Sequence, residues 1–326
     1  MKEISFFKYI INKNLKIGEV KLDNNIDNKL LFTELNNVYL YPGLWSVISN
    51  DYFIFADFER YLSKYKHDIE IIKRQNEIKK NLQLISQIKG TYYLFGAEEN
   101  YWHFLIDFIP RLVCLKYLSH RRIKVIVSDK LPEKFFHFIS KVVTLLNIPK
   151  IVFLKINQNN LVYSFEKLIF SSRPSISFAS NFLNQILKDN IVKTKKKNLY
   201  VKRGNTIRRK VLNEDEIIDF VKKYDYDIVD CFDLDIEEQI KIFSEAKNII
   251  IPSGASMANL MFTPDNINVV EIRSNLDGDF SEKINLKKRF KLYSFNKTIK
   301  VGEQLRKNII VDVDELKKLI EEKNIF

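Results

Sequence analysis

The sequence predicts an α/β protein with two domains. From residue 100 onward, short apolar runs alternate with segments whose apolar residues recur at helical spacing, which is typical of parallel sheets covered by helices. The 326 residues exceed the roughly 100–200 of an average domain. Because the alternation breaks near residues 172–195, we place the domains at residues 1–178 and 179–326 and expect two Rossmann-like folds facing a cleft.

Residues 1–90 are less regular than the rest of the chain. Alternating polar and apolar residues predict strands at 37–41 and 52–55. Apolar residues at roughly helical intervals predict a charged helix at about 59–87.

The first α/β region begins with a helix over residues 100–118. The elements expected after it are a strand at 123–127, a helix at 132–146, strands at 150–154 and 168–170, and a loop at 171–177. A basic run at 193–197 then precedes the second region.

The second region shows the clearest alternation. The expected elements are strands at 198–202, 227–229, 248–251 and 269–272, and helices at 213–223, 236–246 and 256–261. Asn213 followed by Glu216, and Asp235 followed by Glu238, have the spacing of capping boxes and mark the starts of two of these helices.

Charge and composition limit the classes of function. Lys and Arg number 53 against 41 Asp and Glu, a net charge of +12 that favours polyanionic partners. Neither an aromatic RNA-binding strand nor a short basic recognition helix is evident, so nucleic acid is not expected as a partner. A non-catalytic α/β protein, or one that binds nucleic acid or another polyanion, is the alternative interpretation.

The apparent lack of targeting signals and the positions of the two cysteines predict a cytoplasmic location. No apolar run approaches the roughly 20 residues that span a bilayer, and the N-terminus lacks the features of a signal peptide. Cys114 and Cys231 lie far apart, which favours buried thiols in a reducing compartment.

Several common catalytic motifs are absent. The eight glycines have neither GxGxxG nor GxxxxGK spacing, which excludes a dinucleotide fingerprint and a P-loop. Residues 254–258 resemble a nucleophile elbow, but all four histidines precede it, whereas a hydrolase needs its histidine afterwards. Asp225, Asp227, Asp233 and Asp235 have the spacing of manganese ligands; helix capping explains Asp235 better, so we expect no metal.

The first of three candidate clusters lies in the predicted helix at 100–118. His103, Asp107 and Arg111 are spaced i, i+4 and i+8 and therefore share one face, while their neighbours are apolar. A positioned histidine or carboxylate can act as a general base. A structural histidine beside a surface Asp–Arg pair is the alternative interpretation.

The second cluster follows the strand at 198–202. Arg203, Arg208 and Arg209 come at its carboxyl end, where α/β sheets bind their ligands, and guanidinium groups suit phosphate oxygens. A solvated basic loop is the alternative, which fits Arg209 and Lys210 better than Arg203.

The third cluster follows the strand at 248–251. Ser253, Gly254, Ala255 and Ser256 lead into a short helix that contains Asn259. The amino end of a helix offers N–H groups and a positive dipole to an anion. A strand-to-helix turn without a ligand is the alternative.

Taken together, these segments resemble glycosyltransferase family 61, which contains plant xylosyltransferases, animal O-linked N-acetylglucosaminyltransferases and bacterial capsule and lipopolysaccharide enzymes. The matching residues are His103, Asp107, Pro110, Arg111, Arg203, Arg208 or Arg209, Asn213, Glu214, Glu238, Gln239, Gly254, Ala255, Asn259, Phe262, Val270 and Glu271. The resemblance covers about residues 95–275, and Ser253 stands where the family usually has a histidine.

The resemblance implies a GT-B fold and an inverting, metal-independent glycosyltransferase of the hexosyl-, pentosyl- or N-acetylhexosaminyl type. The implied donor is a nucleotide sugar, expected to be a UDP-sugar, with no further cofactor. The implied acceptor is a glycan or lipid-linked glycan in bacterial surface polysaccharide synthesis, with peripheral contact to the anionic inner face of the cell membrane. Residues 1–178 would form the acceptor side and residues 179–326 would bind the donor.

The resemblance also implies roles for individual residues. His103 is expected to be the base with Asp107 orienting it, and Asp107 as the base is the alternative. The residues expected to bind the donor are Arg111, Arg203, Arg208, Asn213, Ser253, Gly254, Ala255, Ser256 and Asn259.

Overall fold

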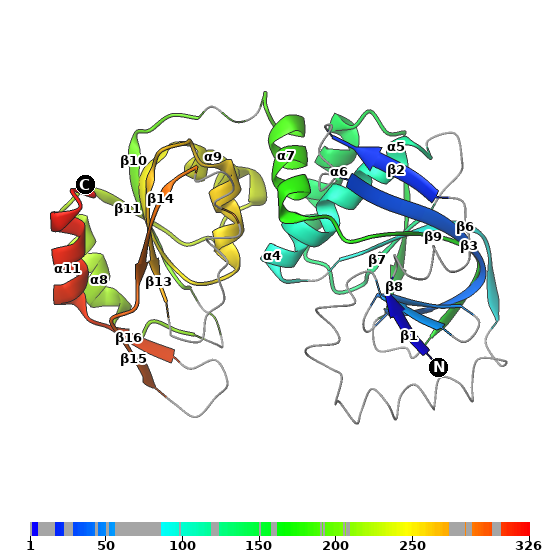
Figure 1. Cartoon of the computed structure of the whole chain (residues 1–326), viewed down its shortest axis with the longest axis horizontal. Coiled ribbons are helices and arrows are strands. Elements are labelled where there is room, and N and C mark those ends of the chain that lie inside the picture. The colour runs from blue at the N-terminus through cyan, green and yellow to red at the C-terminus, as the bar shows by residue number, and fades with distance from the viewer. Residues whose placement is uncertain are drawn as a thin grey trace. The chain divides into compact units, whose positions relative to one another are not determined.

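The chain divides into two compact units, Met1–Phe182 and Leu183–Phe326 (Figure 1). The computed structural model describes residues 2–5, 17–22, 29–42, 45–49, 52–55, 86–97, 99–118, 124–149, 151–157, 162–189, 191, 193–204, 206, 209–273, 284, 289–301 and 308–326. The acceptor and donor roles expected for the two parts of the chain stay predictions.

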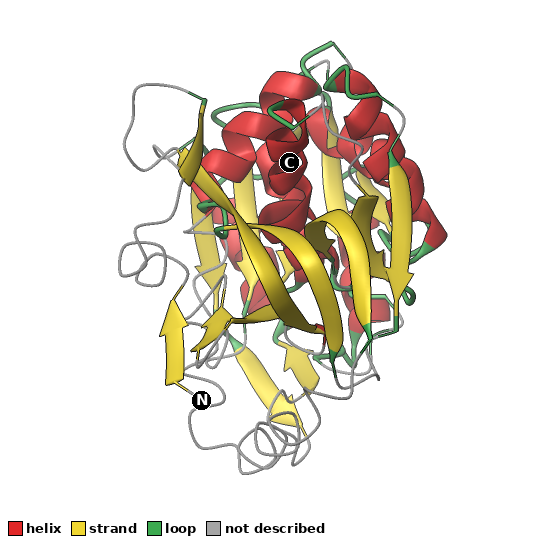
Figure 2. Cartoon of the chain, turned by 90° about the vertical axis from the view of Figure 1, so that its right-hand side faces the viewer, coloured by secondary structure: helices red, strands yellow, loops and turns green. Residues whose placement is uncertain are grey.

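The described strands of the N-terminal unit form one mixed sheet (Figure 2). They are β1 (Lys2–Ser5), β2 (Ile17–Lys21), β3 (Lys29–Tyr41), β4 (Ser46–Ser49), β5 (Tyr52–Phe55), β6 (Gln87–Gly96), β7 (Lys124–Ser128), β8 (Val152–Ile156) and β9 (Tyr163–Ser171). Their order is β1-β5-β4-β3-β9-β6-β7-β8, with β2 paired to β3. Neighbours among β9, β6, β7 and β8 pair in parallel, whereas β3 pairs antiparallel with β2, β4 and β9.

Helical segments connect the parallel strands of this unit. The segments α4 (Tyr101–His103), η3 (Phe104–Phe108), η4 (Ile109–Leu112) and α5 (Val113–Lys116) join β6 to β7, and α6 (Glu133–Leu145) joins β7 to β8. The buried rings of Phe104 and Phe135 stack with their centroids 4.0 Å apart, which fixes the first segment against α6.

The helix predicted over residues 100–118 is less regular than the sequence suggests. It passes from α-helix into a π-helical turn at Phe104–Phe108 and then into a 3-10 turn that contains Pro110. Proline has no N–H to donate to the carbonyl of Ile106, so the regular hydrogen-bond ladder cannot continue through it. Single π-turns of this kind occur frequently at functional sites.

The C-terminal unit contains a fully parallel sheet. Its strands β10 (Lys197–Val201), β11 (Tyr226–Val229), β12 (Ala246–Pro252), β13 (Asn268–Ile272) and β14 (Lys291–Phe295) lie in the order β11-β10-β12-β13-β14. Its helical elements are α8 (Glu214–Lys222), α9 (Ile236–Ser244), η5 (Ala255–Phe262) and α11 (Val313–Glu322), and β15 (Thr298–Val301) pairs antiparallel with β16 (Asn308–Val311). In Figure 1, α8 and α11 cover one face of the sheet and α9 the other.

Apolar packing holds the helices on this sheet. Tyr200 and Ile250 of the sheet are buried in one cluster with Phe220 of α8 and with Leu316 and Ile320 of α11. The strand and helix order expected from residue 198 to residue 272 is present, so the predicted α/β class with parallel sheets is confirmed. The cleft expected between the two domains depends on how one unit is placed against the other, so it stays a prediction.

The structure also contains elements that the sequence patterns did not predict. The expected break at 172–195 holds helix α7 (Ile176–Ile186), and β1, β2, β4, β6, β14 to β16 and α11 were not anticipated. The strands expected at 37–41 and 52–55 are present in β3 and β5. Most of the helix predicted at 59–87 lies outside the described residues. In the part of the chain that the structure describes, no helix is long and apolar enough to cross a membrane.

Candidate active site

The N-terminal unit places His103 and Asp107 together just after the carboxyl end of β6. The Nδ1 atom of His103 lies 2.7 Å from Oδ2 of Asp107, so the predicted i, i+4 pair is present. Asp107 is buried, with its side chain 5% exposed, whereas the His103 side chain is 17% exposed. The backbone N–H of His103 donates to Oδ1 of Asn100, which caps this helical segment.

Arg173 completes this cluster, and the sequence analysis did not single it out. Its Nε donates to Oδ1 of Asp107 at 2.8 Å, so both carboxylate oxygens are engaged. Arg173 follows β9 and His103 follows β6, and these neighbouring strands run parallel. The rule that ligand sites gather at the carboxyl ends of parallel strands could have drawn attention to it.

These contacts keep the Asp107 carboxylate ionised. Burial by itself would raise the pKa of Asp107, but the hydrogen bond from His103 and the charge of Arg173 outweigh it and lower that pKa. An ionised carboxylate can only accept, so Nδ1 of His103 must carry the proton of their hydrogen bond. In the neutral ring, Nε2 then has the lone pair and can accept a proton.

Arg111 lies in the 3-10 turn η4, which follows the π-helical turn that carries Asp107. It is buried, its guanidinium lies 4.9 Å from the centroid of the Phe108 ring, and its carbonyl accepts a hydrogen bond from the Tyr93 hydroxyl. The change from π-helix to 3-10 helix between Asp107 and Arg111 breaks the regular spacing. The role in donor binding expected for Arg111 stays a prediction.

In the C-terminal unit, Arg203 lies against Gly254. A Cβ atom placed on Gly254 would overlap Nη1 of Arg203, so the absence of a side chain there gives the guanidinium its position. The Nε of Arg203 donates to the carbonyl of Arg209 at 3.2 Å, and its backbone N–H donates to Oε1 of Glu214 at 2.8 Å. Arg208 lies outside the described residues.

Ser253 lies beside Gly254 in a buried polar network that the sequence analysis did not foresee. Its hydroxyl donates to Oε1 of Glu271 at 2.5 Å, and the Nε of Arg273 donates to Oε2 of Glu271 at 2.8 Å. Glu271 has no exposed side-chain surface. Arg273 directly follows β13, so this carboxyl edge carries a second arginine besides Arg203.

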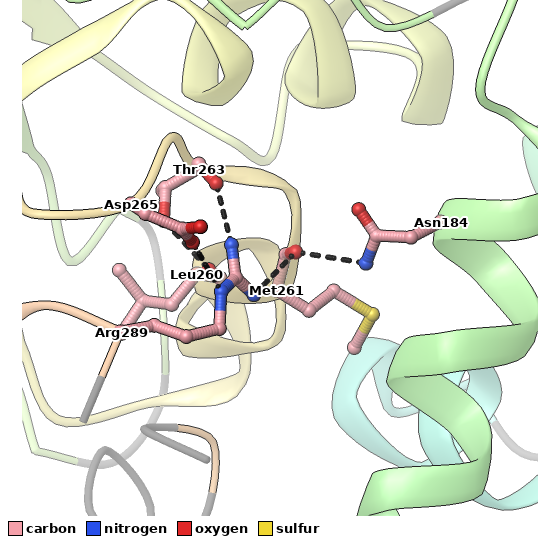
Figure 3. A network of polar contacts seen from close by, with 6 residues as sticks. All are labelled: Asn184, Leu260, Met261, Thr263, Asp265 and Arg289. Atoms are coloured by element: carbon pink, nitrogen blue, oxygen red, sulfur yellow. Dashed lines mark hydrogen bonds and ion pairs between the residues drawn. The ribbon is translucent and has the colours of Figure 1, made fainter. Parts of the chain in front are cut away.

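Helix η5 begins next to this network and is held at its carboxyl end. Ala255 and Ser256 form its first turn, whose N–H groups have no acceptors within the helix itself. At the other end, Arg289 donates to the carbonyls of Met261 and Thr263 (Figure 3). The side chain of Asn184 in α7 also donates to the Met261 carbonyl.

Two residues expected to bind the donor have structural partners. Asn213 precedes α8 but makes no side-chain cap, because its amide instead pairs with both backbone groups of Val311 at 2.9 Å. Asn259 is fully buried and donates to Oε1 of Gln239 at 2.9 Å. The role in donor binding expected for both residues stays a prediction.

Two of the aspartates weighed as metal ligands, Asp227 and Asp235, have other partners. Asp235 and Glu238 form the expected capping box at the start of α9, with Glu238 accepting from the Asp235 N–H at 2.9 Å. Asp227 lies 3.9 Å from the ammonium group of Lys197. Among the described residues, no three His, Cys, Asp or Glu side chains form a group that could hold a metal ion.

Comparison with known proteins places both clusters in one family match. The model of the family Glycosyltransferase 61 matches residues 101–270, which include His103, Asp107, Arg173, Arg203 and Gly254. No curated protein matches the chain in sequence. The structure of the E. coli heptosyltransferase WaaC with ADP is similar at 9% sequence identity and a TM-score of 0.35, covering 73% of this chain and 98% of that chain.

Proposed function

The chain belongs to glycosyltransferase family 61, and on this premise we propose that it transfers a sugar from a nucleotide-sugar donor to a glycan acceptor with inversion and without a bound metal ion. The observation that carries the proposal is the Arg173–Asp107–His103 chain of hydrogen bonds in the N-terminal unit. It supplies a histidine of defined tautomer, which is what activation of a hydroxyl nucleophile requires.

In the proposed reaction, His103 is the base. Its Nε2 takes the proton of the acceptor hydroxyl while that oxygen forms a bond to the anomeric carbon of the donor. The bond from this carbon to the diphosphate oxygen breaks, and the nucleoside diphosphate leaves with the electron pair. Asp107 stabilises the imidazolium that forms, and Arg173 holds Asp107 in place.

The carboxyl edge of the C-terminal sheet is proposed to bind the donor diphosphate. Arg203 and Arg273 supply positive charge there, and the first turn of η5 at Ala255 and Ser256 supplies backbone N–H groups. Such groups stabilise the charge that develops on a leaving diphosphate. Ser253 acts here through Glu271, which positions Arg273.

The proposed donor is a UDP-sugar, and the proposed acceptor is a glycan or lipid-linked glycan of a bacterial surface polysaccharide. The support is the resemblance of the motifs to family 61, which includes bacterial capsule and lipopolysaccharide enzymes. The net charge of +12 also favours peripheral contact with an anionic membrane, where each nearby Lys or Arg contributes about 1 kcal/mol. Equal sedimentation with neutral and anionic liposomes at low salt would contradict this membrane contact.

Replacement of His103 tests the proposed mechanism. After a panel of nucleotide sugars has identified the donor by thermal stabilisation and transfer, His103→Ala should lower kcat by about 10²–10⁴-fold with little change in donor affinity. His137→Ala is the matched control, because His137 lies in the same unit and its side chain is 71% exposed. Normal turnover in His103→Ala combined with an inactive Asp107→Asn would make Asp107 the base instead.

Chelation tests the proposed metal independence. Transfer should continue in EDTA, because Asp235 caps α9 and Asp227 pairs with Lys197. Activity lost in EDTA and restored by manganese would reassign these aspartates to a metal site.

A further inference from the structure

Phe232 is an exposed aromatic residue at the carboxyl end of the C-terminal sheet. It lies in the loop between β11 and α9, and 72% of it is exposed to solvent. Exposing an aromatic ring to water forgoes the stabilisation that its burial would bring. A ring displayed at the edge where α/β sheets bind ligands is therefore a candidate contact for a ligand.

The loop that carries Phe232 is held rigidly. The backbone N–H of Phe232 donates to Oδ1 of Asp230 at 3.0 Å. The buried side chain of Gln239 donates to the carbonyls of Cys231 at 2.9 Å and Leu234 at 3.2 Å, on either side of Phe232. The backbone beneath the ring is thus already ordered, which lowers the entropy cost of binding a flat ligand on it.

The same loop lies against the segment that carries Arg203. Strands β10 and β11 are parallel neighbours with Val201 opposite Val229, and the Lys202 N–H donates to the Val229 carbonyl at 2.8 Å. A Cβ atom on Gly204 would lie 3.1 Å from Oδ1 of Asp230. The residues on either side of Arg203 therefore lie next to Val229 and Asp230, which lead into the loop that displays Phe232.

Gln239 also connects this loop to the other side of the proposed diphosphate site. Its Oε1 accepts a hydrogen bond from Asn259 in η5, the helix that begins next to Gly254. The Phe232 loop, Arg203 and the start of η5 thus belong to one hydrogen-bonded edge of the C-terminal unit.

We propose that the Phe232 ring is the stacking surface for the nucleobase of the donor. The inference rests on the proposed function, because it takes the diphosphate to lie at Arg203. Arginine recognises the charge of the diphosphate, whereas a phenyl ring recognises the flat face of the base next to it. Every nucleobase has such a face, so the ring contributes affinity for the nucleoside without selecting a particular base.

Calorimetry with two ligands separates the roles of Phe232 and Arg203. UDP, GDP, ADP and CDP are titrated first, and the tightest binder is then compared with inorganic pyrophosphate, which has no base. Phe232→Ala should weaken nucleotide binding on the order of 10- to 100-fold, the range of base–aromatic stacking. The same variant should leave the affinity for pyrophosphate unchanged. Phe232→Trp should retain the affinity for the nucleotide. Arg203→Ala should lower the affinity for both the nucleotide and pyrophosphate.

A matched control and a spectroscopic signal complete the test. Ile299→Ala removes another exposed apolar side chain of the same unit, 69% exposed in β15, and should leave both affinities unchanged. The tryptophan of Phe232→Trp should be quenched by the nucleotide beyond the change seen in the wild-type protein.

The outcomes distinguish this inference from the proposed function. If Arg203→Ala lowers the affinity for the nucleotide and Phe232→Ala does not, the proposed stacking on Phe232 is wrong. The proposed diphosphate site at Arg203 is then still supported. An equal loss of pyrophosphate affinity in Phe232→Ala would also overturn it, because the ring would then act through the phosphate site. If none of the four nucleotides binds the wild-type protein, the proposed function fails together with this inference.

Discussion

Gly254 shows how a single residue can set the chemistry of the C-terminal edge. Its φ of 178° and ψ of −173° are extended and open to any residue, so its conformation does not require glycine. The requirement is steric, because a Cβ atom would overlap Nη1 of Arg203. Since that atom ends a flexible side chain, substitution would displace the guanidinium and leave the backbone in place.

At this residue scale we predict that Gly254→Ala reproduces the effect of Arg203→Ala. Each variant should weaken binding of the nucleoside diphosphate by about 1.5–3 kcal/mol, the contribution of hydrogen bonds to charged groups. The double variant should lose little more than either single one, because both changes remove the same contact. Calorimetry checks this, and additive losses would show that Gly254 and Arg203 act independently.

At the scale of elements, the buried amides of Gln239 and Asn259 join the loop after β11 to helix η5. Gln239 is 2% exposed and donates to two loop carbonyls, while its own oxygen accepts from Asn259. Removing either partner leaves buried polar groups without their hydrogen bonds, which costs more than the bond itself contributes.

Gln239→Ala and Asn259→Ala should therefore each lower the free energy of unfolding by about 1–3 kcal/mol. The loss in the double variant should be smaller than the sum of the two single losses by at least about 0.5 kcal/mol, because the two residues share one hydrogen bond. Urea denaturation measures all four proteins, and Lys241→Ala, on the exposed face of α9, is the control. Strictly additive losses would contradict the coupling of loop and helix.

At the scale of the whole molecule, the ion pair of the buried Asp107 with the partly exposed Arg173 makes stability depend on pH. The pKa of Asp107 is lower in the folded chain than the roughly 3.9 of an unfolded aspartate. A lowered carboxyl pKa adds stability that is complete above the unfolded value and is lost as the pH falls through the folded value. The pair therefore contributes most near neutral pH.

Arg173→Gln should destabilise the protein by about 2–4 kcal/mol at pH 7, because it leaves a buried carboxylate without its cation. The difference from wild type should shrink as the pH falls below about 4, since protonation of Asp107 removes the charge that Arg173 compensates. Urea midpoints from pH 3.5 to pH 7.5 test this, with the exposed Lys188→Gln as the control. A difference that stays constant over this range would mean that Arg173 acts through packing alone.

The sequence by itself determined the features that depend on near neighbours in the chain. Helical spacing predicted the His103–Asp107 pair, and the capping pattern predicted the start of α9 at Asp235. The strand and helix order from residue 198 to residue 272 followed from local periodicity. These inferences hold because a side chain four residues away is brought close by the helix itself, whatever the rest of the chain does.

Tertiary structure decided which partners these residues have. Arg173 reaches Asp107 from 66 residues away because β6 and β9 are parallel neighbours, and Arg203 meets Gly254 because β10 and β12 are. Local spacing missed the π-helical and 3-10 turns around Pro110, and it missed the contacts of Asn213 with Val311 and of Asn259 with Gln239. Strand order is a property of the whole sheet, so periodicity within one segment cannot reveal which loops meet at its edge.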